Sequence, residues 1–129
     1  PTRIRVGDIV APRAEHWDAA QHDGRRAAAT ILGAPAPEAT APWFWTARHH
    51  RHVEGVGRMA DAETTIIRGQ LGADTFSAFG FRDGLIVGAV AVDDSNAVRA
   101  ARRMIDRAVT VDPQRLADTA IDIRKLLRG

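Results

Sequence analysis

The pattern of apolar and polar residues predicts a short strand, a helix and a linker in the first part of the chain. Residues 4–10 alternate weakly and predict a short strand. In residues 15–32 apolar positions recur at helical spacing, and Gly33 follows directly, which is typical of the end of a helix. Residues 34–42 carry three prolines among small residues, so they predict an extended linker rather than a helix or a central strand.

Short runs of strand character follow the linker. They cover residues 44–46, 50–56, 64–68, 75–82 and 85–92. The last two runs are joined by Asp83-Gly84, a dipeptide that suits a tight hairpin because both central residues of such a turn adopt positive φ. We therefore expect an antiparallel sheet.

Helical spacing returns after the last strand. Residues 95–108 have apolar positions in a 3-4-3 pattern, and Asp94 or Ser95 can cap their start. A further helical turn begins at Pro113, and residues 121–127 predict a short terminal segment. Strands followed by helices predict an α+β fold, in which a small antiparallel sheet has helices packed on one side.

Size and composition limit the class of protein. A chain of 129 residues fits one compact domain. Without cysteine it can form no disulfide and no thiolate zinc site, so the cytoplasm is the simplest compartment. The apolar run 85–92 is far shorter than the roughly 20 residues that cross a bilayer, so we expect no membrane association.

The charge balance does not indicate a nucleic-acid-binding protein. The pI of 10.3 arises from a net charge of only +2, because the chain has no Tyr or Cys and little titrates between neutrality and the arginines. Acidic residues are spread among the arginines, and only three Trp and four Phe are present. A nucleic-acid groove requires a basic stripe with exposed aromatic residues, so we expect no nucleic-acid partner.

Three short motifs carry the most information about function. They are Gly7-Asp8, Glu15-His16-Trp17 and Pro42-Trp43-Phe44-Trp45. In this order, before a small sheet and a helix, they resemble the C-terminal third of flavin-dependent NAD(P)H:ferredoxin reductases, which supply electrons to rubredoxins, cytochromes P450 and dioxygenases. The resemblance implies three parts: residues 1–33 as a strand and helix left from a flavin-binding domain, 34–42 as a linker, and 43–129 as a reductase C-terminal-like α+β domain.

The resemblance also implies roles for four residues. Asp8 would bind the ribityl chain of the flavin, and Trp17, Trp43 and Trp45 would line the flavin pocket near the docking surface of a ferredoxin-like iron–sulfur partner. Indoles do supply planar surfaces that stack on rings. Taken singly, a Gly-Asp pair after a strand also marks a turn, and a Trp cluster also occurs in an ordinary core.

The glycine pattern that holds a dinucleotide is missing from the sequence. A Gly-x-Gly-x-x-Gly turn before a helix cradles the pyrophosphate in such domains, whereas Gly55-Val56-Gly57 lacks the third glycine. We therefore expect FAD only if a dinucleotide-binding domain completes the chain, and otherwise no cofactor. The chain is either a fragment of a longer enzyme or a stand-alone descendant. Residues 46–48 read Thr-Ala-Arg where the family usually has Ser-Asp-Gln, which favours the second alternative.

A histidine-rich stretch at residues 49–54 is the second candidate for chemistry. In an extended strand, His50, His52 and Glu54 would share one face. Two imidazoles and a carboxylate could act as an acid–base pair or bind a divalent metal, although a solvated polar face has the same pattern. We expect no metal site.

Two functions remain open. The first is the C-terminal module of a flavin-dependent ferredoxin reductase, which shapes the flavin pocket and the electron exit to an iron–sulfur partner. The second is a flavin-free biosynthetic cyclase or isomerase that holds a hydrophobic small molecule in a Trp-lined pocket, where His16, His50 or Glu54 would move protons. The arginines of residues 99–107 either form a solvated helix face or dock an acidic partner. Since the helix at 15–32 would lack its family sheet, we predict a homodimer that covers it.

Overall fold

The N-terminal segment forms a small hairpin. The computed structural model describes residues 5–6, 9–10 and 14–128, so the predicted flavin ligand Asp8 lies outside the described residues. Strands β1 (Arg5–Val6) and β2 (Ile9–Val10) pair antiparallel. The single strand predicted for residues 4–10 is therefore wrong, because the chain reverses direction between two short strands.

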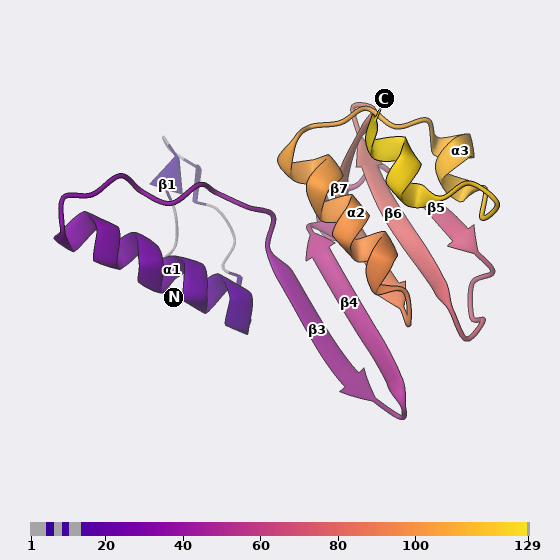
Figure 1. Ribbon diagram of the computed structural model, residues 1–129, viewed down its shortest axis with the longest axis horizontal. Coiled ribbons are helices and arrows are strands. Elements are labelled where there is room, and N and C mark those ends of the chain that lie inside the picture. Colours follow the sequence, from indigo (N-terminus) through magenta and orange to yellow (C-terminus); the bar gives the residue numbers. More distant parts are fainter. Residues whose placement is uncertain (1–4, 7–8, 11–13, 129) are drawn as a thin grey trace.

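Five antiparallel strands form the main sheet, as the strand pattern predicts. They lie in the order β3-β4-β7-β6-β5 (Figure 1). Their bounds are β3 Trp43–Arg48, β4 Arg51–Gly57, β5 Thr64–Gly69, β6 Phe76–Arg82 and β7 Leu85–Val92. Asp83 and Gly84 join β6 to β7 with φ angles of 51° and 74°, which confirms the predicted tight hairpin.

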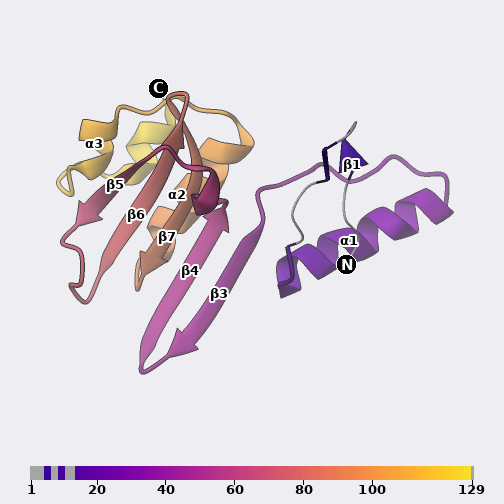
Figure 2. The same cartoon turned by 180° about the vertical axis from the view of Figure 1, so that it is seen from behind.

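The helices of the C-terminal half cover one face of this sheet. Helix α2 (Ser95–Asp106) packs on β7 and β4, with α3 (Pro113–Ala117) and the 3₁₀ segment η2 (Ile123–Arg128) beside it on the same side (Figure 1). Asp94 caps α2 by accepting a hydrogen bond from the N–H of Ala97 at 3.1 Å. The α+β architecture is thus confirmed, and Figure 2 shows the strands from the side opposite to α2.

The core lies between the sheet and α2. Phe79, Met104, Val56, Val98 and Leu116 have their side chains fully buried there. On the other face, the 3₁₀ turn η1 (Met59–Asp61) crosses close to the strands, and a Cβ on Gly88 would lie 2.6 Å from the backbone nitrogen of Met59. Glycine at position 88 therefore permits the turn to pack directly on the sheet.

Helix α1 (Trp17–Ile31) stands apart from this core. It confirms the predicted helix, and Gly33 follows it with a φ of 63°. None of the α1 residues is buried, and Ile31 is 83% exposed. Arg102 of α2 contacts its first turn by donating to Asp18 at 3.3 Å. In the part of the chain that the structure describes, neither α1 nor any other helix is long and apolar enough to cross a membrane.

The linker between α1 and β3 is anchored at its far end. The backbone N–H of Ala41 donates to Oδ1 of Asp106 at the end of α2, at 2.7 Å. Thr40 accepts a hydrogen bond from Arg102 at 3.1 Å, and the carbonyl of Pro42 accepts one from the N–H of Gly57 at 2.8 Å. These bonds fix where the chain enters the sheet.

Candidate functional site

Three indole rings meet where α1 approaches β3. The rings of Trp43 and Trp45 are stacked, with centroids 4.7 Å apart and planes at 26°. Trp17, from the first turn of α1, meets Trp45 edge-on with a centroid distance of 5.8 Å. Both distances fall in the attractive range for aromatic pairs. The structure thus brings together the three tryptophans that the sequence analysis proposed as cofactor-binding residues.

The β3 pleat explains why two of the indoles share a face. Trp43 and Trp45 are two residues apart, and their cross-strand partners are Val56 and Glu54, which face the core beneath α2. Trp43 packs against the edge of that core, whereas Trp45 is 42% exposed and Trp17 is 61% exposed. The cluster therefore runs from the core outwards and offers an apolar aromatic surface to solvent.

Phe44 and His16 lie on the opposite side of β3. The Phe44 ring covers Gly55, where a Cβ would come within 2.3 Å of its Cε1 atom. The imidazole of His16 packs 5.9 Å from the same ring, and its Nδ1 atom is buried with no hydrogen-bond partner among the described residues. His16, a candidate proton carrier, thus lies with Phe44 rather than with Glu54.

Glu54 is the buried polar centre of the site. Its carboxylate, in a residue only 6% exposed, accepts a hydrogen bond from Trp43 Nε1 at 3.0 Å and one from the hydroxyl of Ser95. The His52 Nε2 atom lies 3.2 Å from its Oε1 atom. A buried carboxylate is costly unless its oxygens are hydrogen-bonded, and here donors from β3 and α2 meet it.

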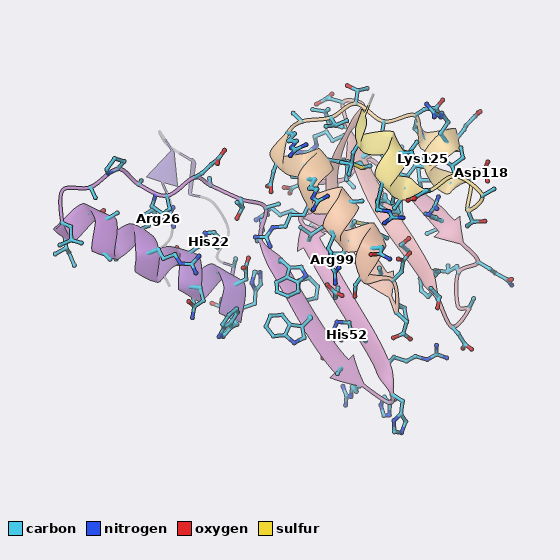
Figure 3. All side chains as sticks on the ribbon, in the orientation of Figure 1. His22, Arg26, His52, Arg99, Asp118 and Lys125 are labelled. Atoms are coloured by element: carbon cyan, nitrogen blue, oxygen red, sulfur yellow. The ribbon has the colours of Figure 1, made fainter. Side chains whose placement is uncertain are left out.

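The predicted grouping of His50 with His52 and Glu54 is wrong. His50 and His49 form the two-residue turn between β3 and β4, with φ angles of 60° and 51°. Strand β4 begins at Arg51, so His52 rather than His50 lies beside Glu54. Figure 3 labels His52 on this hairpin. Two non-glycine residues at positive φ are uncommon, and for this reason the sequence gives no sign of the turn. Among the described residues, no group of three or more His, Cys, Asp or Glu side chains is arranged to hold a metal ion.

Arg51 fixes the tip of this hairpin to the rest of the sheet. Its guanidinium donates to the backbone carbonyl of Asp74 at 2.7 Å and also pairs with the carboxylates of Asp74 and Asp93. The hydrogen bond from Arg51, and then its charge, lower the pKa of Asp74. An open depression of about 360 Å³ lies at the tip and is lined by residues 47–52 and Asp93.

The arginines of residues 99–107 differ in their surroundings. Arg99, Arg103 and Arg107 are exposed on α2, and Figure 3 shows Arg99 on the outer side of that helix. Arg102 is only half-exposed, because it binds Asp18 and Thr40. Arg102 is therefore not part of the solvated helix face considered for the arginines of residues 99–107, because its guanidinium connects α2 to α1.

The molecule is an α+β module with an aromatic cluster on the edge strand β3 of its sheet. Residues 43–127 match the family described as "Reductase C-terminal". The chain belongs to this family, which confirms the resemblance drawn from the Pro-Trp-Phe-Trp motif.

Two relatives illustrate the similarity. The ferredoxin–NAD(+) reductase component of an anthranilate 1,2-dioxygenase system from Burkholderia cepacia is 35% identical over 116 residues, which cover 89% of this chain and 29% of the relative. A probable ferredoxin reductase from Castellaniella defragrans is 31% identical over 107 residues, covering 83% of this chain and 26% of the relative. The chain therefore spans less than a third of the length of either protein.

Solved structures share the fold. The putidaredoxin reductase–putidaredoxin complex superimposes with a TM-score of 0.88 over 94% of this chain and 29% of the matched chain, at 23% identity. A ferredoxin reductase from Rhodopseudomonas palustris superimposes with a TM-score of 0.79 over 88% of this chain and 28% of that one, at 28% identity. Both comparisons again match the module to a minor part of a longer protein.

Proposed function

We propose that this chain acts as the C-terminal module of a flavin-dependent ferredoxin reductase, in which it closes the flavin pocket and shapes the electron exit to an iron–sulfur protein. The observation that carries the proposal is the indole cluster, whose outer members Trp45 and Trp17 keep large exposed surfaces although they are ordered by ring contacts. Exposed aromatic surface of this kind is suited to contact with a further apolar or planar partner. The relatives named as ferredoxin reductases support the same function.

The residues present fit contact with a flavin ring but not retention of a whole dinucleotide. The indoles supply flat apolar surface, whereas the sequence has no Gly-x-Gly-x-x-Gly turn for the pyrophosphate. FAD would therefore be held by a dinucleotide-binding domain elsewhere in the complete enzyme. When bound, a flavin supplies the exchange between two-electron hydride chemistry and one-electron transfer. In this arrangement Trp17, Trp43 and Trp45 would exclude water from one side of the pocket.

The partner is a ferredoxin-like iron–sulfur protein with an acidic surface. Arg99, Arg103 and Arg107 give α2 an exposed positive face, and complementary charge guides such encounters. One structural neighbour is itself a reductase held to its iron–sulfur protein, putidaredoxin, which supports this class of partner.

A domain replacement tests the proposal. In the Burkholderia cepacia reductase, the C-terminal segment that aligns with this chain would be replaced by residues 1–129. We expect the chimera to bind FAD and to reduce ferredoxin from NADH, and we expect Trp45→Ala in the chimera to slow that reduction while FAD stays bound. A chimera that holds FAD but passes no electrons to ferredoxin would overturn the proposed function.

The cyclase or isomerase, the homodimer and the cytoplasmic location were the other expectations from the sequence. The named relatives are reductases, and His50 lies in a turn apart from Glu54. These observations give no support to a cyclase or isomerase with a hydrophobic ligand. The homodimer and the cytoplasmic location stay predictions. Exposed α1 residues such as Ile31 and Leu32 are compatible with a covering partner of any kind.

A further inference from the structure

The proposed function assigns no role to the buried carboxylate of Glu54. Its carboxylate, on β4, accepts hydrogen bonds from two other elements, β3 through Trp43 and α2 through Ser95, and the His52 Nε2 atom of the same strand lies 3.2 Å from its Oε1 atom. Of these donors only the Trp43 indole belongs to the aromatic cluster. The carboxylate is therefore the point at which the sheet controls the orientation of the stacked rings.

A continuous series of side-chain contacts runs from the core to the surface. Glu54 accepts from Trp43, the Trp43 ring stacks on Trp45, and Trp45 meets Trp17 edge-on. A tryptophan side chain rotates about two torsions, so apolar packing alone leaves its ring several orientations. The bond from Nε1 to Oε2 at 3.0 Å selects the orientation that places the Trp43 face against Trp45.

We propose that Glu54 is a positioning residue that sets the plane of Trp43, and through it the Trp43–Trp45 stack, by accepting the indole N–H. The inference rests on the proposed function for its purpose, since an ordered stack is what closes a flavin pocket. Its physical content concerns this chain alone. The essential property is an acceptor at this site, because removal of the acceptor leaves a buried N–H unsatisfied.

Hydrogen exchange in the unaltered chain gives the first test. The indole N–H resonances of Trp17, Trp43 and Trp45 can be assigned by NMR with single Trp→Phe variants. We expect the N–H of Trp43 to exchange markedly more slowly than those of the exposed Trp17 and Trp45. Equal exchange at all three indoles would overturn the proposal without any change at Glu54.

Two substitutions of similar size then separate the acceptor from the shape of the side chain. Glu54→Gln keeps a carbonyl that can accept from Trp43 and an amide that can donate to Ser95, whereas Glu54→Met fills the space without an acceptor. Stacked indoles give an exciton couplet in circular dichroism, and the couplet of the Trp43–Trp45 stack is the part of the signal that Trp43→Phe removes, since the Trp17–Trp45 contact remains in that variant. We expect Glu54→Gln to retain the couplet and Glu54→Met to lose it.

The controls address a general loss of structure. Glu63→Met makes the same change at a carboxylate whose side chain is 61% exposed, and Ser95→Ala removes a donor that does not belong to the stack. Both should keep the couplet. A folded Glu54→Met protein with an intact couplet, or loss of the couplet in Glu54→Gln, would overturn the proposal. If Glu54→Met does not fold, the exchange rates in the unaltered chain decide.

These measurements are independent of the proposed function. They require neither flavin nor a redox partner, so an intact couplet in Glu54→Met would refute the positioning role even if the chimera reduced ferredoxin. Conversely, an inactive chimera would leave the hydrogen bond and its effect on the stack unchanged.

Discussion

Helices α1 and α2 lie in very different environments. Helix α2 buries Ala97, Val98, Ala100, Ala101 and Met104 against the sheet, whereas α1 buries none of its residues. Helix α1 contacts the rest mainly through the ring of Trp17 and the side chain of Asp18. The difference indicates that residues 41–128 close a core of their own, to which α1 contributes no buried residue.

The largest effect should come from the core beneath α2. Phe79 is fully buried, and Phe79→Ala would leave a cavity under the helix. We expect a loss of about 3–5 kcal/mol in the free energy of unfolding, measured by urea denaturation. Leu32→Ala, at a residue 79% exposed next to α1, serves as the matched control and should be close to neutral. A similar loss at both positions would remove the contrast between the two regions.

A steric change on the opposite face should cost less. The Cβ in Gly88→Ala would lie 2.6 Å from the Met59 nitrogen, so the η1 turn must move away from the sheet. We expect a loss of roughly 1–3 kcal/mol, as for other overpacked sites. Gly72→Ala is not a suitable control because of its φ of 85°, whereas Gly24→Ala in α1 meets no atom within 4 Å and should be neutral or stabilising. Thermal unfolding of both variants would measure the difference.

Arg102 should control the attachment of α1 more than the stability of the sheet. Removal of its guanidinium in Arg102→Ala breaks the bonds to Asp18 and Thr40. Partly exposed ion pairs contribute about 0–1 kcal/mol, so global unfolding should change little. Amide hydrogen exchange in α1 should nevertheless become faster, while β6 and β7 keep their protection. Unchanged exchange in α1 would show that the remaining contacts, Trp17 with Trp45 and His22 with Thr40, are sufficient to hold the helix. Arg99→Ala, at an exposed position on the same helix, is the control.

The smallest effect concerns an exposed pair near the C-terminus. Hydrogen bonds from the Arg124 side chain, and then from its backbone, lower the pKa of Asp122 from 3.8 to about 2. Because the folded pKa is depressed, any contribution to stability is present above pH 3.8 and is lost as the pH falls towards 2. The carboxyl titration followed by NMR should show the low value, and Arg124→Ala, which removes the side-chain hydrogen bonds and keeps the backbone one, should raise the pKa of Asp122 towards 3.8. A pKa of Asp122 near 3.8 in the unaltered chain would contradict the hydrogen bonding between Asp122 and Arg124.

Much of the fold follows from the sequence because its elements are defined locally. Helix α2 is set by apolar spacing and the Asp94 cap, and the β6–β7 hairpin by Asp83-Gly84. The His49-His50 turn escaped prediction, because two consecutive non-glycine residues seldom adopt the positive φ found there. Such a turn is stabilised by the strands that it joins.

The site was predicted less completely than the fold. The resemblance to reductases brought Trp17, Trp43 and Trp45 together, and the structure shows their contact directly. His52 was predicted to lie beside Glu54, but the other two partners of Glu54 were not foreseen, since Trp43 reaches it through the β3–β4 register and Ser95 through the docking of α2. Both contacts depend on tertiary packing, which no spacing within one element encodes.

The anchored end of the linker limits how the two regions can move. Because Ala41 is bound to Asp106, any swivel of α1 must take place upstream, in the Ala-Pro-Ala-Pro stretch that begins at Ala34. Two prolines restrict the backbone torsions of this short linker even when no other protein is bound. The linker therefore limits the orientations that α1 can take. A partner that bound α1 would cost little conformational entropy of the linker.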